Sequence, residues 1–163
     1  MKAFIALLFV ASQLFASALG LYDGFYVYGG RSQTASKHSY LVFGLYPALP
    51  DCKLVDKFPG YFAMDDVSKN QGVNCNGDGC PQSQKDPQRL DRVEINVEFG
   101  HYTWYKNRDN NLVDLGDRVV GKCFEQHEIF TSGEVHCRKP TDKGEQKVDI
   151  YPYLWCDTKV WKA

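Results

Sequence analysis

Apolar and polar residues alternate along residues 91–99 with a period of two. The apolar positions share one side of this segment, and they are Val93, Ile95, Val97 and Phe99. The polar positions share the other side, and they are Arg92, Glu94, Asn96 and Glu98. Because successive side chains of a strand lie on opposite faces of a sheet, this period predicts a half-buried strand.

Other apolar and aromatic runs, bounded by turn residues, predict the remaining strands. They cover residues 24–28, 40–46, 101–106, 112–115, 118–124, 134–138 and 147–156. We expect 24–28 to pair with 40–46, and 118–124 to pair with 134–138, as two hairpins. Pro152 has no backbone N–H to donate, so it marks the last strand as an edge strand or as the place of a bulge.

Helical periodicity is nearly absent from the chain. One or two helical turns are expected within 61–69, because Pro59 precedes this segment and proline is favoured near the start of a helix. Residues 70–88 are rich in Asn, Asp, Gly and Pro and are expected to be irregular. The predicted fold class is therefore mainly β, an antiparallel sheet or a β-sandwich with at most one short helix, stabilised by disulfides.

The first 20 residues differ from the rest of the chain. Lys2 precedes an apolar run, and small residues follow at 16–20, which is the pattern of a secretory signal peptide. We expect a signal peptide at 1–20 and a single secreted, extracellular domain at 21–163. No second apolar run is long enough to span a membrane. The formal net charge of −1 excludes a strongly basic nucleic-acid binder.

The cysteine count fits an oxidising compartment. All six cysteines lie within 21–163, and an even number in a secreted chain predicts disulfide bonds. Cys75 and Cys80 flank a loop whose glycines allow a short ring to close, so we expect them to pair with each other.

The predicted hairpin suggests how the other four cysteines pair. Cys123 and Cys137 lie on the inward faces of its two strands and are expected to bond across it. Cys52 and Cys156 then remain, and their bond would tie the first half of the chain to the last strand.

Metal binding is not expected. No Cys or His pair follows Cys75 and Cys80 at the spacing of a zinc finger. The nearby polar residues Asn74, Asn76 and Asp78 lack the closing Glu of an EF-hand calcium loop. We expect neither a metal ion nor a cofactor.

The polar sides of the predicted strands carry groups suited to acid–base chemistry. Glu98, Arg118 and His136 each lie on a different strand, and His38 precedes another. On neighbouring strands they would form a site for RNA transesterification. A carboxylate or His can take the 2′-hydroxyl proton, a second His can protonate the leaving oxygen, and an Arg can stabilise the developing negative charge. Ordinary solvated surface is the alternative, because charged residues alternate on any half-buried strand.

The order of these residues resembles that of the small fungal guanyl-specific ribonucleases. The stretch 116–120 (GDRVV) looks like the Arg-bearing strand of this family, and 135–136 (VH) stands where the family has its final His. The resemblance covers residues 90–137. It implies an α+β ribonuclease-like fold as the alternative fold class, RNA as the substrate, and catalytic roles for His38, Glu98, Arg118 and His136.

Aromatic residues suggest a second kind of site. One cluster lies on the strand 101–106 and comprises Tyr102, Trp104 and Tyr105. The other shares one face of the last strand and comprises Tyr151, Tyr153 and Trp155. Two interpretations stay open: these residues build the core, or they form a recognition surface, since Tyr and Trp dominate binding hot spots.

The whole chain resembles the small secreted cysteine-rich proteins that fungi export as effectors. The likeness lies in its size, its signal peptide, its even cysteine count and its lack of enzyme motifs. It implies a virulence or host-interaction role. We therefore expect a monomeric, non-enzymatic binding protein whose partner is a host or extracellular protein rather than a membrane. A secreted ribonuclease that binds RNA is the alternative.

Overall fold

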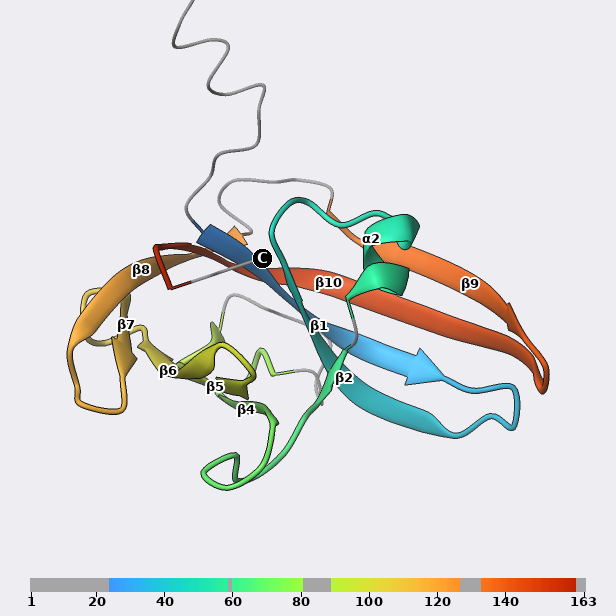
Figure 1. The fold of residues 1–163 in the computed structure, drawn as a ribbon, viewed down its shortest axis with the longest axis horizontal. Coiled ribbons are helices and arrows are strands. Elements are labelled where there is room, and N and C mark those ends of the chain that lie inside the picture. Colours follow the sequence, from blue (N-terminus) through green and yellow to red (C-terminus); the bar gives the residue numbers. More distant parts are fainter. Residues whose placement is uncertain (1–23, 59, 81–88, 127–132, 161–163) are drawn as a thin grey trace, which may run out of the picture.

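The described part of the chain contains ten strands and one helix (Figure 1). It covers residues 24–58, 60–80, 89–126 and 133–160 of a computed structural model. The strands are β1 (Gly24–Gln33), β2 (Ser39–Tyr46), β3 (Tyr61–Phe62), β4 (Gly72–Asn76), β5 (Arg92–Val97), β6 (Gly100–Tyr105), β7 (Asn111–Asp114), β8 (Val119–Glu125), β9 (Val135–Thr141) and β10 (Gly144–Thr158). The helix is α2 (Cys52–Lys57). The predicted fold class, a mainly antiparallel β protein with one short helix, is confirmed, whereas the expected signal peptide lies outside the described residues.

The strands form one sheet that turns back on itself. Its order is β3-β2-β1-β10-β8-β7-β6-β5-β4, and β9 also pairs with β10. The two ends of this path meet at a parallel bridge between Ala63 and Val73, where the Met64 N–H donates to the Val73 carbonyl oxygen at 3.0 Å. The side chains enclosed by the sheet form the main core, which includes Phe25, Val27, Phe43, Leu45, Val93, Ile95, Trp104, Leu112 and Leu154.

Two long hairpins, β1–β2 and β9–β10, extend beyond this closed part (Figure 1). The turns of the two hairpins lie against each other. Gly144 is so close to Ala35 that a Cβ on Gly144 would come within 2.8 Å of the Ala35 Cβ. On the face of these hairpins opposite the main core, a smaller cluster packs beneath α2. Its buried members are Tyr28, Val42, Tyr46 and Ile150.

The alternation along 91–99 is confirmed over β5. Val93, Ile95 and Val97 are buried, and the intervening residues are half-buried on the other face. The strand ends at Val97, so Glu98 lies in the turn that leads to β6. The expected hairpin between 24–28 and 40–46 is also confirmed, with Tyr26 opposite Tyr46.

The predicted hairpin between 118–124 and 134–138 is wrong. β8 and β9 both pair with β10, along different parts of its length. β9 pairs with Gly144–Ile150 and β8 with Leu154–Thr158. β10 has 15 residues, enough to take both partners one after the other along the same side.

The bulge predicted as one alternative at Pro152 is present. Val27 pairs with Leu154, but the next residue of β1, Tyr28, pairs with Pro152. One extra residue in β10 exchanges the two faces of the strand from that point on. The edge-strand alternative is wrong, since β10 has neighbours on both sides.

The helix forms earlier than predicted. It covers Cys52–Lys57, and the Asp51 side chain caps its start by accepting a hydrogen bond from the Leu54 N–H at 2.8 Å. The segment 61–69 instead begins with β3, which pairs with β2. The predicted irregular stretch 70–88 contains β4, where Val73 is fully buried opposite Ile95. Residues 81–88 lie outside the described residues.

Three disulfides join the cysteines, and one of the expected pairs is confirmed. Cys75 bonds to Cys80. The other two expected pairs are wrong, because Cys123 bonds to Cys156 and Cys52 bonds to Cys137. The reason is the strand pairing: Cys123 on β8 lies directly opposite Cys156 on β10.

Cys137 is placed differently from Cys123. It lies on β9 opposite Val148, on the face that meets α2, and can therefore bond to the first residue of the helix. In the described residues no helix is long and apolar enough to cross a membrane.

Candidate functional site

The four residues expected to form a ribonuclease site are not brought together. His136 lies opposite Asp149 on β10. Arg118 precedes Gly121, which lies opposite Thr158 at the far end of the same strand. The nine steps along the strand from Asp149 to Thr158 correspond to about 30 Å, too far for two groups that must reach one phosphate.

Each of these side chains instead has a local partner. Glu98 accepts a hydrogen bond from the Tyr61 hydroxyl at 2.7 Å. Arg118 is 82% exposed and pairs with Asp114 at 2.6 Å. His38 lies in the turn before β2, with its Nδ1 2.9 Å from the Ser36 hydroxyl. No catalytic arrangement follows from these separate contacts.

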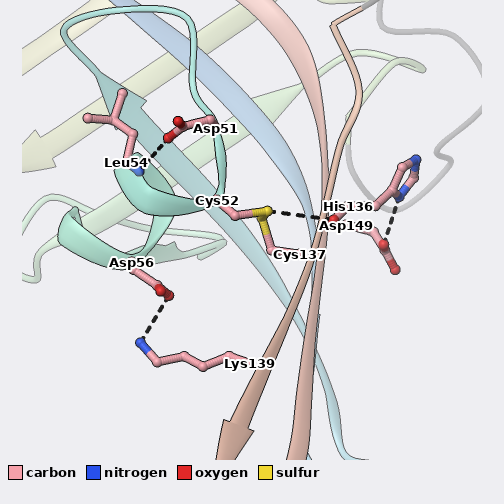
Figure 2. The surroundings of a disulfide bond; sticks show 8 residues. All are labelled: Asp51, Cys52, Leu54, Asp56, His136, Cys137, Lys139 and Asp149. Carbon is pink, nitrogen blue, oxygen red and sulfur yellow. Dashed lines mark hydrogen bonds and ion pairs between the residues drawn. A yellow bond between two sulfur atoms is a disulfide. The ribbon is translucent and has the colours of Figure 1, made fainter.

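His136 on β9 lies between two carboxylates, one from β10 and one from the residues just before β9. Its Nδ1 is 2.8 Å from Asp149 Oδ1, and its Nε2 is 3.3 Å from Glu134 Oε2. The hydrogen bond to Asp149, followed by the weaker one to Glu134, raises the pKa of His136 above its usual value. His136 and Asp149 lie on the side of β9 that faces away from the helix (Figure 2).

Replacing Asp149 by asparagine is expected to lower the pKa of His136. In the parent protein the raised pKa favours the protonated imidazole in the folded state. The resulting stabilisation is complete below the ordinary histidine pKa of about 6.5 and is lost as the pH rises through the raised value. An NMR titration of the imidazole protons measures the change. Glu134→Gln is the matched comparison and should lower the pKa less, because Glu134 is farther from the ring. An unchanged titration in Asp149→Asn would contradict the assignment.

The predicted aromatic clusters do not form one recognition surface. Trp104 and Tyr153 are buried in the main core, where the Trp104 indole N–H donates to the Cys123 carbonyl oxygen at 3.2 Å. Tyr151 precedes the bulge in β10 and Trp155 follows it, so these two lie on opposite faces of the sheet. The expectation that 151, 153 and 155 share a face is therefore wrong.

The other two aromatic residues of the first cluster have partners just before and just after β6. Tyr102 is half-buried, and its hydroxyl donates to the Phe99 carbonyl oxygen at 3.0 Å. The guanidinium carbon of Arg108 lies 4.3 Å from the centre of the Tyr105 ring. Tyr102 and Tyr105 therefore make local contacts, whereas the buried aromatic residues, Trp104 and Tyr153, are part of the main core.

A groove beneath α2 is the candidate site that the structure reveals. Its floor is the outer face of the two long hairpins, where side chains from adjacent strands lie in rows. One row runs from Tyr40 through Ser32 and Val148 to Cys137. The next row contains Val42 and Ile150. The space enclosed is about 390 Å³, within the range of small-molecule sites.

The helix forms the roof of the groove and is held over it by two links to β9 (Figure 2). The Cys52–Cys137 disulfide joins the first residue of the helix to the strand. One turn later, Asp56 Oδ1 pairs with Lys139 Nζ at 2.9 Å. Val55 of the helix and Phe58 after it line the groove, and Phe58 packs edge to face on Tyr46 with ring centroids 6.4 Å apart.

Tyr46 closes one end of the groove and is uncharged at neutral pH. Burial raises the pKa of Tyr46 to about 12, with a smaller contribution from Tyr28. A side chain at Gly44 would collide with the Tyr46 ring, since a Cβ there would lie 2.2 Å from the hydroxyl oxygen. The glycine thus lets the ring lie flat against β2. Tyr40 and Phe62, which are 45% and 60% exposed, form an aromatic rim at the side.

The sequence contained one signal for this groove. Residues 40–46 are apolar on both faces of the strand, which is typical of a strand covered on both sides. The groove itself is lined by residues from five separate parts of the chain, within 32–34, 40–46, 55–62, 137–139 and 146–150. The pairing of β9 with β10, which completes the groove, was not predicted.

Among the described residues, no group of three or more His, Cys, Asp or Glu side chains is placed to hold a metal ion. Comparison of the chain with protein-family models, curated proteins and solved structures gave no match. The residues of the groove are accordingly the basis on which a function is inferred.

Proposed function

We propose that this chain is a secreted, non-enzymatic binding protein that holds a small, mostly apolar ligand in the groove beneath α2. The groove itself carries the proposal. It is concave, enclosed between a helix and a sheet, lined mainly by apolar and aromatic side chains, and has a few polar groups at defined positions, as small-molecule sites have.

The lining does not favour catalysis. The ionised side chains that line the groove are Asp56 and Lys139, and they pair with each other. Among the described residues of its lining there is no histidine, and the cysteine, Cys137, is in a disulfide. A general acid and a general base placed to act on one substrate are therefore absent from this lining.

Secretion is supported by the three disulfides, which persist in oxidising compartments, and by the signal-peptide pattern of residues 1–20. In this proposal the protein acts outside the cell that makes it, in the manner of an effector, on a host or extracellular target. The ligand in the groove is then carried to that target or taken from it.

Filling the groove is expected to weaken binding. Val148 lies on its floor, so Val148→Phe occupies space that a ligand would need. We expect the neutral fluorescent probe N-phenyl-1-naphthylamine to bind the parent protein, and its affinity to fall at least about tenfold in the variant, a loss of about 1.4 kcal/mol. Fluorescence titration measures both.

Val119→Phe is the matched control. Val119 is 58% exposed on β8, outside the groove, so the same substitution there should leave probe affinity unchanged. Equal affinities for Val148→Phe and the parent protein would contradict the groove as the site. The same preparations are incubated with RNA, where the proposal expects no cleavage. Cleavage that disappears in His136→Ala would instead support the ribonuclease alternative.

A further inference from the structure

The polarity of the groove changes along its length. Thr34, Ser32 and Gln146 lie near the turns of the two long hairpins. Val42, Ile150 and Tyr46 lie toward the other end. A molecule that fills the groove therefore meets hydrogen-bonding groups at one end and an apolar pocket at the other.

The charges in the lining cancel. Asp56 and Lys139 are bonded to each other at 2.9 Å on the border between helix and sheet. An anionic ligand would have to compete with Asp56 for Lys139, and a cationic ligand would have to compete with Lys139 for Asp56. Neither sign of charge has an unpaired partner among the lining residues that the structure describes, which favours an uncharged ligand.

The polar end offers one donor and one acceptor side by side. The Gln146 Nε2 donates to the Ser32 Oγ at 3.0 Å. This bond uses the Ser32 oxygen as an acceptor and leaves its hydroxyl proton to donate, while the Gln146 carbonyl oxygen can accept. A ligand hydroxyl, which both accepts and donates, matches this pair.

The apolar part has room for an extended chain. From Tyr40 to Gly44 the floor follows β2, and four steps along a strand span about 13 Å at about 3.3 Å per residue. The Tyr46 ring lies over Gly44 and closes this end of the groove.

We infer that the groove binds an uncharged aliphatic alcohol of medium chain length, with its hydroxyl between Ser32 and Gln146 and its chain directed toward Tyr46. This inference rests on the proposed function, since it names the ligand class of the same groove.

A matched series of compounds, each with an unbranched chain of eight carbons, tests the head group. 1-Octanol, methyl octyl ether, octanoate and octylammonium are each used to displace N-phenyl-1-naphthylamine from the full protein. 1-Octanol should bind most tightly. The ether accepts a hydrogen bond but cannot donate one, so it should bind about fivefold to tenfold more weakly, as expected for one lost hydrogen bond. The two ions should bind at least about tenfold more weakly than the alcohol.

Variants then locate the hydroxyl. Gln146→Leu keeps the approximate shape of the side chain and removes its carbonyl, so it should bring 1-octanol and the ether to equal affinity. Gln33→Leu is the matched control, because Gln33 lies next to Ser32 in sequence but on the opposite face of β1, outside the groove. It should leave the preference for the alcohol unchanged.

The outcomes separate this inference from the proposed function. Octanoate or octylammonium binding as tightly as 1-octanol, or an unchanged preference for the alcohol in Gln146→Leu, overturns the alcohol assignment and leaves the groove as a binding site. If neither the fluorescent probe nor any of the four compounds binds, the proposed function fails as well. Sedimentation velocity showing a dimer that Val148→Phe dissociates would mean that a second copy fills the groove, and this also overturns both.

Discussion

Replacing both Cys52 and Cys137 by alanine is expected to abolish probe binding in the groove while the sheet stays folded. The helix has six residues, and helices this short are not stable without tertiary contacts. Its remaining polar link to β9, the Asp56–Lys139 pair, is about half exposed at both side chains. Exposed ion pairs contribute only about 0.2–1 kcal/mol, so of the two links to β9 the disulfide is the one that mainly fixes the roof of the groove.

The same variant should also unfold more easily. The disulfide closes a loop across a sequence separation of 85 residues. Loop-closure entropy for such a length gives an upper value of about 4–5 kcal/mol for its contribution to the free energy of unfolding. Far-ultraviolet circular dichroism measures the unfolding transition, and titration with N-phenyl-1-naphthylamine measures binding at a temperature where the variant is folded.

Cys75→Ala/Cys80→Ala is the matched control for this experiment. That disulfide closes a separation of only 5 residues and lies outside the groove. Its removal should lower the free energy of unfolding by about 2 kcal/mol, by the same loop-length relation. It should leave probe affinity unchanged. If the folded Cys52→Ala/Cys137→Ala variant bound the probe as tightly as the control, the helix would not be the roof that the groove requires.

The sequence predicted the parts of this fold that depend on neighbouring residues. The alternation along β5 was correct, because which face each side chain takes is set within the strand. The Cys75–Cys80 bond was correct because the short glycine-containing loop between them determines it. The bulge at Pro152 was foreseen as one of two alternatives, since proline lacks the N–H that a continuous ladder needs.

Which strands that lie far apart in the sequence pair with each other could not be predicted from such local patterns. Nothing within β8 or β9 indicates that both pair with β10, and the two wrong disulfides followed from joining them to each other. The same error brought Arg118 and His136 together in the expected catalytic site. The helix was misplaced because six residues with no buried member give almost no periodic signal.

The aromatic residues show why burial decides the role of a side chain. Trp104 and Trp155 both lie on strands that read as apolar and aromatic, and both were candidates for a recognition surface. Trp104 is fully buried, whereas Trp155 is half-buried and packs on Tyr26 with ring centroids 4.6 Å apart. Sequence alone did not separate these two environments, because the bulge between Tyr151 and Trp155 changes which face points inward.

Trp104→Ala is expected to destabilise the protein more than any other single aromatic substitution. Its indole lies in the main core and donates to the Cys123 carbonyl oxygen. Truncation leaves a large cavity and an unsatisfied acceptor, at a cost of about 3–5 kcal/mol. That is a large share of the about 5–15 kcal/mol by which small domains are stable. Urea unfolding followed by circular dichroism measures the loss.

Trp155→Ala is the matched control, since it removes the same side chain from a half-buried position. It should lower the free energy of unfolding by less than half as much as Trp104→Ala does, because less apolar surface is returned to water and a smaller cavity forms. Trp104→Phe keeps an aromatic ring in the core and should recover part of the stability lost in Trp104→Ala. Equal losses for Trp104→Ala and Trp155→Ala would show that Trp104 does not have the core role that its burial assigns to it.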